Sequence, residues 1–122
     1  MAEAIARYDA ADVIQASSAG LVPLGFIPEL TTQTLKNNGY SASGLSSIKM
    51  THDACDAADI IINMTGRPNE EAFSHHDKVE DWIVRDPFGQ DWETYQRVFE
   101  GIKRRVGQLS EVLRHKRQAK KE

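Results

Sequence analysis

A long amphipathic helix near the C-terminal end constrains the fold more than any other sequence feature. Apolar residues recur there mostly three or four positions apart, which places them on one face of a helix: Trp92, Tyr95, Val98, Phe99, Ile102, Val106, Leu109, Val112 and Leu113. Asp91 stands at the N-cap position. Two ion pairs with i,i+4 spacing are expected along the exposed side, Glu93–Arg97 and Glu100–Arg104. An apolar face of this length needs a packed partner, and we expect it to lie on a sheet.

Shorter apolar segments upstream predict that sheet. Residues 60–64 read Ile-Ile-Ile-Asn-Met, an apolar run without alternation that is typical of a strand buried on both faces. Residues 13–16 and 79–84 are further strand candidates, and helices are expected at 28–38, 51–58 and 68–73. Strands that alternate with helices in this way predict an α/β fold, an open parallel sheet with helices on both faces.

The chain opens on MAEAIAR, which favours a helix from the first residues. No Ser, Thr, Asp or Asn precedes this helix to cap its backbone N–H groups. Parallel strands are normally joined by helices, so a leading helix suggests a strand before it. We therefore expect that Met1 corresponds to an internal methionine of a longer ancestor, and that the usual first strand is lacking.

Length and charge limit the class of protein. The 122 residues suit a single domain, expected over residues 1–113, followed by a basic, frayed tail over residues 114–122. A net charge of −3 gives no general attraction to nucleic acid. No apolar run approaches the roughly 20 residues that span a bilayer, and no apolar signal segment opens the chain. We expect a cytoplasmic protein without nucleic-acid or membrane partners.

Five segments, taken in order, resemble the low-molecular-weight protein tyrosine phosphatases and their relatives, the thioredoxin-coupled arsenate reductases. MAEAIAR resembles the helix after the family's phosphate loop, whose pattern is C-x5-R-S-x-M-A-E, and residues 17–20 resemble its strand-end SAG. Residues 57–64 and 80–87 resemble two later strand segments, and DPFGQDWETYQRVFEGIKRRV resembles the last loop and helix. The resemblance covers the chain to about residue 113 and implies a parallel sheet of four strands, here without the first.

The resemblance implies hydrolysis of phosphomonoesters through a phosphocysteine intermediate, with phosphate or phosphotyrosine as ligand and no cofactor. Asp86 matches the family's general acid, and Ser18 matches the serine that supports the phosphate loop. From spacing alone, Asp86-Pro87 indicates the cap of a turn. The family's nucleophilic cysteine and phosphate-binding arginine would precede Met1, so the phosphate-binding residues are unknown and the chain is expected to be inactive.

Other groups offer little replacement chemistry. Cys55, the single cysteine, has no arginine at the spacing of the phosphate loop, and three acidic residues lie near it in the sequence, Asp53, Asp56 and Asp59. Residues 65–70 lack the further redox cysteines that arsenate reduction requires in the family. His75-His76-Asp77 are adjacent residues that cannot easily converge on one ion, so no metal site is predicted.

Three functional interpretations remain open. In the first, the chain is a phosphatase-family fragment, either because the start codon was placed too late or because the gene has lost its 5′ part. In the second, it is a natural non-catalytic relative that dimerises or binds a partner. In the third, it belongs to the arsenate reductase branch. Loss of a central strand would leave backbone donors and acceptors unpaired on the sheet edges. We therefore expect a homodimer through the exposed sheet edge.

Overall fold

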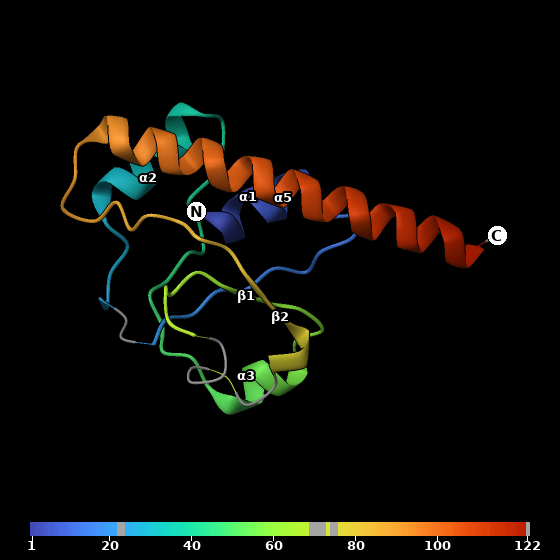
Figure 1. The fold of residues 1–122 in the computed structure, drawn as a ribbon. Helices are drawn as coiled ribbons and strands as arrows, with labels where there is room; N and C mark the ends of the chain where they lie inside the picture. Colours follow the sequence, from blue (N-terminus) through green and yellow to red (C-terminus); the bar gives the residue numbers. More distant parts are fainter. Residues whose placement is uncertain (22–23, 69–72, 74–75, 122) are drawn as a thin grey trace.

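Four helices and two short strands make up the described structure. The computed structural model describes residues 1–21, 24–68, 73 and 76–121. Its elements are α1 (Ala2–Asp9), α2 (Glu29–Asn37), α3 (His52–Ala57), β1 (Ile61–Asn63), the 3₁₀ turn η1 (His76–Lys78), β2 (Val79–Asp81) and α5 (Trp92–Lys121) (Figure 1). Helices α2 and α3 and the final helix confirm three sequence predictions. Most of the helical turn predicted at 68–73 lies outside the described residues.

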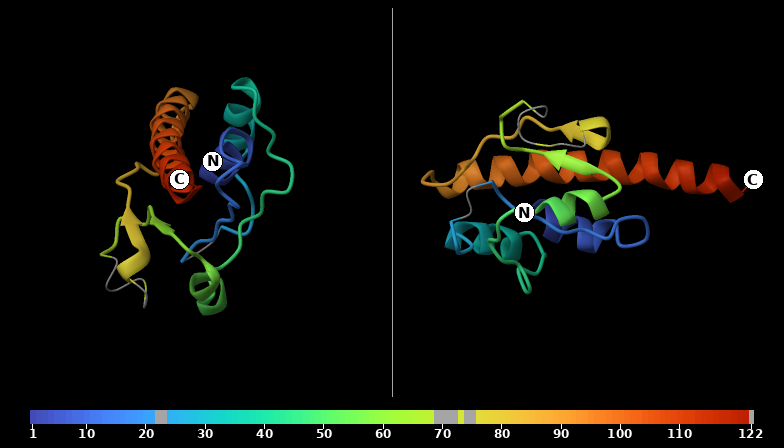
Figure 2. Two further views of the ribbon diagram at one scale, coloured as in Figure 1. Left: turned by 90° about the vertical axis from the view of Figure 1, so that its right-hand side faces the viewer. Right: turned by 90° about the horizontal axis from the view of Figure 1, so that it is seen from below.

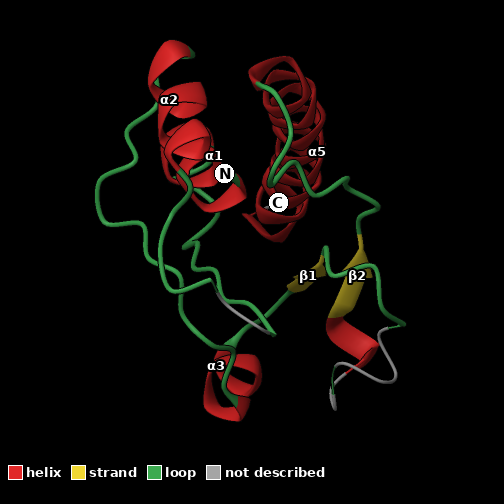
Figure 3. Ribbon diagram, turned by 90° about the vertical axis from the view of Figure 1, so that its left-hand side faces the viewer, coloured by secondary structure: helices red, strands yellow, loops and turns green. Residues whose placement is uncertain are grey.

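The elements form layers around the small sheet. Helix α5 packs against both α1 and α2 on one side, and α3 lies on the other side of the strands (Figures 2 and 3). This arrangement confirms the α/β class with helices on both faces. The C-terminal end of α5 extends beyond the rest of the molecule (Figure 1). Within the described residues, no helix is long and apolar enough to cross a membrane.

The sheet contains two parallel strands in the described part of the chain. Ile61 is in register with Val79 and Asn63 with Asp81, and the Trp82 N–H donates to the Asn63 carbonyl at 2.9 Å. These strands confirm the candidates at 60–64 and 79–84, although each is shorter than predicted. A further contact is the isolated parallel bridge between Gly20 and Lys49.

The strand predicted at residues 13–16 is wrong. The N–H groups of Val13 and Ile14 both donate to the Ala10 carbonyl, at 3.1 and 2.8 Å, so this segment begins as a turn. Among the described residues, no backbone hydrogen bond reaches residues 15–19. A strand is defined by its ladder of hydrogen bonds, and no described strand forms one with this segment.

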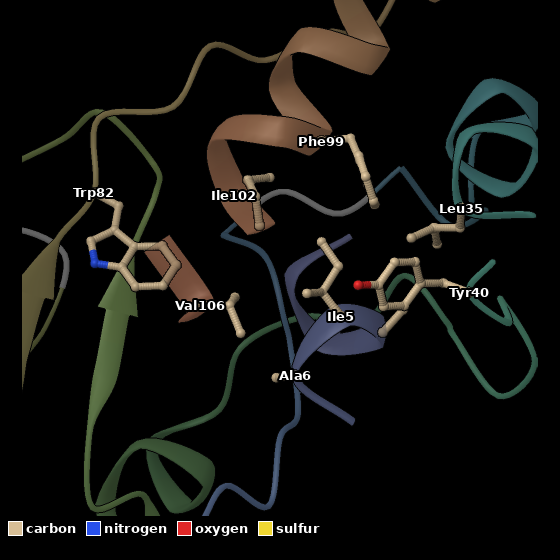
Figure 4. Packing of buried hydrophobic residues seen from close by; sticks show 9 residues of the cluster. Ile5, Ala6, Leu35, Tyr40, Trp82, Phe99, Ile102 and Val106 are labelled. Carbon is tan, nitrogen blue, oxygen red and sulfur yellow. The ribbon is translucent and has the colours of Figure 1, made fainter. Parts of the chain in front are cut away.

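The main core lies between the helices (Figure 4). Ile5 of α1 and Leu35 of α2 are completely buried, and Phe99 of α5 is 2% exposed. The rings of Tyr40 and Phe99 meet edge to face with centroids 5.6 Å apart. From the sheet side, Trp82 joins the same cluster. The apolar face of α5 therefore packs on α1 and α2 as well as on residues that follow the sheet, rather than on the sheet alone.

The two ends of α5 differ in how well the sequence predicted them. The Asp91 carboxylate accepts hydrogen bonds from the Thr94 N–H at 3.0 Å and hydroxyl at 2.8 Å, which confirms the N-cap and lowers the pKa of Asp91. The two predicted i,i+4 ion pairs of α5 are wrong, since neither forms within 4.0 Å in the described structure. Exposed pairs of this kind contribute little, so spacing alone does not fix their geometry.

At its other end, α5 is helical through Lys121 and so enters the segment predicted as a tail. The Arg114 guanidinium binds both carboxylate oxygens of Asp12, at 2.9 and 3.0 Å, and the Asp9 carbonyl at 2.9 Å. Arg117 donates to the Asp12 carbonyl at 2.9 Å. The predicted boundary between domain and tail at residue 113 stays a prediction. The first turn of α5 beyond this residue is hydrogen-bonded to the turn that follows α1.

The ionisation of Tyr40 makes the stability of this core depend on pH. Its hydroxyl donates to Asp9 at 2.6 Å, and the ring is 7% exposed. Burial and, secondly, the hydrogen bond to Asp9 raise the pKa of Tyr40 to about 12. The folded state therefore holds this proton more tightly than the unfolded chain, in which the pKa is about 10.

We expect the free energy of unfolding to decrease at high pH through Tyr40. This contribution is fully present below about pH 10 and is lost as pH rises through about 12, an order of 2 to 3 kcal/mol. Urea unfolding at several pH values should show that the Tyr40→Phe variant is less stable than the wild type at pH 9. As the pH rises further, the variant should lose less stability than the wild type. Tyr8→Phe, which changes an exposed ring, should keep the wild-type pH dependence. Equal losses in all three proteins would contradict the role of Tyr40.

Candidate functional site

Ser18 and α1 are joined by a buried carboxylate. The Ser18 hydroxyl donates to Oε1 of Glu3 at 2.7 Å, and Nη2 of Arg7 lies 2.7 Å from Oε2 of the same residue. Glu3 is only 8% exposed, and a buried carboxylate needs partners of this kind. Sequence reasoning selected Ser18 but missed Glu3 and Arg7. The observed bond fixes the segment after α1 to the first turns of that helix, whereas support of a phosphate loop by Ser18 stays a prediction.

Asp86 lies in an exposed turn beyond the carboxyl end of β2. Its Oδ1 accepts the Phe88 N–H at 3.0 Å, and the Gln90 N–H donates to the Pro87 carbonyl at 2.9 Å. Gly89 closes the turn at a φ of +80°, which glycine adopts without strain. The carboxylate thus shapes the turn, as the spacing of Asp86-Pro87 indicated. Its role as a general acid stays a prediction.

Two aromatic side chains flank this turn. The rings of Phe26 and Phe88 meet edge to face with centroids 6.4 Å apart, and both are about half exposed. Sequence reasoning missed this pair. Phe88 follows Asp86 by two positions and could have been selected, but nothing in the sequence indicates that Phe26 reaches the same place. Two half-exposed rings of this kind can contact an aromatic ligand.

Asn63 organises the loop that follows β1, at the same end of the sheet. The side chain is 3% exposed, and its Nδ2 donates to the Arg67 carbonyl and to Asp81, both at 2.9 Å. Its Oδ1 accepts from the Thr65 N–H at 3.0 Å and from the Thr65 hydroxyl at 2.6 Å. All the hydrogen-bonding capacity of the buried amide is therefore used to hold this loop.

Cys55 lies at the opposite end of the sheet. It belongs to α3, which residues 58–60 connect to the amino end of β1, whereas Asp86 follows the carboxyl end of β2. Because the two strands are parallel, these two positions lie at opposite ends of the sheet. Ile61 stands six positions after Cys55, where the C-x5-R pattern requires arginine. The structure therefore does not bring the thiol and Asp86 together.

The histidines do not add a metal centre to what is described. Among the described residues, no group of three or more His, Cys, Asp or Glu side chains is placed to hold a metal ion. His75 lies outside those residues, and His76 begins η1.

With this geometry in place, comparison with known families identifies the chain. The sequence profile of the family described as low molecular weight phosphotyrosine protein phosphatase matches residues 1–119. The chain belongs to this family. The match confirms the resemblance that five short segments predicted, and extends it almost to the last residue.

Several known proteins are similar to this chain over most of their length. The chain is 28% identical to Arsenate reductase 1 of Bacillus cereus over 114 residues, which cover 92% of this chain and 84% of that protein. An arginine phosphatase from Geobacillus stearothermophilus has the same fold, with a TM-score of 0.85, 22% identity and coverage of 97% and 86%. An arsenate reductase structure in a phosphate-binding state has a TM-score of 0.75, 24% identity and coverage of 92% and 86%.

In this phosphatase-family chain, the Ser18 hydroxyl is expected to contribute to stability through Glu3. Ser18→Ala leaves the buried carboxylate with one partner fewer, and we expect a loss of about 1 kcal/mol in the free energy of unfolding. Ser17→Ala is the matched control, because Ser17 is the adjacent serine, exposed like Ser18 but without such a bond in the described structure. Urea unfolding measures both. Equal effects of the two substitutions would show that the Ser18–Glu3 bond is not stabilising.

Proposed function

We propose that these 122 residues form a phosphatase-like domain that does not hydrolyse phosphomonoesters by itself. The observation that carries the proposal is the position of the one thiol. Phosphocysteine chemistry needs a thiolate among phosphate-binding donors and within reach of an acid. Cys55 stands at the amino end of the parallel strands and Asp86 beyond their carboxyl end. No arginine follows Cys55 at the required spacing.

We propose that the chain retains the general acid of the family's active site. Asp86 corresponds by resemblance to the group that protonates the leaving oxygen and then activates water. The exposed rings of Phe26 and Phe88 beside it suit an aromatic leaving group such as that of phosphotyrosine. These features support phosphate or phosphotyrosine as the ligand class of the ancestral site. The chain itself would then act as a non-catalytic binding relative, cytoplasmic and without a cofactor.

Arsenate reduction is the second candidate. The 28% identity to Arsenate reductase 1 favours it. The resemblance implies, however, two further redox cysteines in that chemistry, and these 122 residues contain one cysteine in all. We therefore place this interpretation below the first.

Hydrolysis of para-nitrophenyl phosphate tests the proposal. We expect no turnover above buffer from the chain or from Asp86→Asn, because the nucleophile has no counterpart near Asp86. An active low-molecular-weight tyrosine phosphatase assayed in parallel provides the positive control. Turnover that decreases in Asp86→Asn would mean that Asp86 still serves as an acid with another nucleophile, and the proposal would be wrong.

We also propose that the chain forms a homodimer through the free edge of β1. Strand β2 occupies one edge of β1, and in the described structure no backbone hydrogen bond joins the other edge to residues 15–19. Ile62 of β1 and Met64, which follows this strand, are only partly buried against the core. An unpaired strand edge beside apolar side chains favours addition of a strand from a second copy.

Light scattering after size exclusion tests the dimer. At micromolar concentration we expect the mass of two chains, and we expect Ile62→Lys to shift the mass towards one chain because a charge on an edge strand opposes pairing. Val112→Lys, at a half-exposed position of α5, should leave the dimer intact. Circular dichroism verifies that both variants are folded. A wild-type mass of one chain across the concentration range would contradict the proposal.

A further inference from the structure

A groove runs between the segment after β2 and one face of α5. Its volume is about 260 Å³, and its apolar floor includes Val84, Val98 and Ile102. Ile83 stands at its edge with 92% of its surface exposed. Gly101 lies in the middle of the lined face of α5, and a Cβ atom placed there would meet no atom within 4 Å. The absence of a side chain at Gly101 thus helps to keep the groove open.

Four arginines line the same groove: Arg85, Arg97, Arg104 and Arg105. No acidic side chain contributes to its lining, and none of these guanidinium groups forms an ion pair within 4.0 Å in the described structure. Arg105 lies over the Trp82 ring at 5.8 Å, and Arg85 has only a 3.5 Å contact to Gln90. In a chain with a net charge of −3, this is a local concentration of positive charge, although Arg97 is also attracted to Asp91 at the start of α5.

We propose that this groove, hereafter the arginine groove, binds an extended acidic segment of a partner protein. Its lining positions on α5 extend from Thr94 to Arg105, about 16 Å at the helical rise of about 1.5 Å per residue. An extended chain covers that length with about five residues. The apolar floor suits aliphatic side chains, and the arginines suit carboxylates. Arg97 and Arg104 are about 10 Å apart along the helix axis, which favours separate acidic side chains over one small anion.

The arginine groove does not depend on the proposed function. Its described lining includes neither Asp86 nor Cys55, and its binding can be measured without any assay of hydrolysis. A failure of this proposal therefore leaves the proposed function untouched, and the reverse also holds.

Fluorescence anisotropy with a labelled peptide tests the charge of the groove. The probe is a short peptide of glutamates and leucines, and its control replaces each glutamate by glutamine. We expect saturable binding of the acidic peptide only, weakened by added salt because ionic contacts are screened. Arg104→Glu should weaken binding at least tenfold. Lys116→Glu makes the same charge change at an exposed position of α5 outside the groove, and should change binding less than twofold.

A pair of glycine variants tests the shape of the groove without altering an arginine. Gly101→Leu should fill the floor and weaken peptide binding at least tenfold. Gly107→Leu is the matched control, since Gly107 lies on the same helix, also has open space at its Cβ position, and does not line the groove. Both variants should raise the thermal midpoint, because leucine favours a helix more than glycine does. A loss of binding in Gly101→Leu alone cannot then be ascribed to unfolding.

Several outcomes would overturn the proposal. They are equal binding of the acidic and glutamine peptides, equal effects of Arg104→Glu and Lys116→Glu, and no binding of the acidic peptide. A single-stranded oligonucleotide that binds more tightly than the peptide, with the same sensitivity to Arg104→Glu, would assign the groove to nucleic acid instead. Inorganic phosphate that displaces the peptide at low concentration would assign it to a small anion.

Discussion

The packing of α5 against α1 and α2 is the contact on which the rest of the structure depends. Two parallel strands of three residues each cannot hold a domain together, because so small a sheet buries little apolar surface. The completely buried Ile5 and Leu35, with Phe99 between the helices, supply the burial that the sheet lacks. Helix α1 in turn carries Glu3, so the position of Ser18 depends on the same helical core. A change in that core would therefore reach the candidate site.

Features that are local in the sequence could be predicted, and features that need a distant partner could not. The apolar period of α5, its Asp91 cap and the isoleucines of β1 each specify their own element, and all three elements are confirmed. Two positions of the predicted apolar face of α5 do not pack, however, since Trp92 is 60% and Val112 50% exposed. Residues 13–16 have strand composition as well, but strand structure requires a neighbour that the described chain does not provide. Past Leu113, Arg114 of α5 contacts Asp12, far away in the sequence. No local pattern encodes that contact.

The same distinction applies to the candidate site. Resemblance located Asp86 and Ser18, and their immediate surroundings follow from nearby residues, as in the turn from Asp86 to Gln90. The Phe26–Phe88 contact and the Ser18–Glu3 bond join segments that the fold brings together, so no local pattern indicated either. The separation of Cys55 from Asp86, by contrast, could have been inferred. Cys55 stands in the last turn of α3, which leads into the amino end of β1, whereas Asp86 follows the carboxyl end of the parallel strand β2.

The two proposed binding surfaces lie on different sides of the sheet. The free edge of β1 faces away from β2, whereas the arginine groove begins in the segment that continues β2 and ends on α5. Strand β2 therefore lies between them. The two surfaces also differ in chemistry, because the β1 edge presents backbone groups and guanidinium groups line the groove. A domain that uses both surfaces could assemble with itself through backbone pairing and still recognise an acidic partner through side chains.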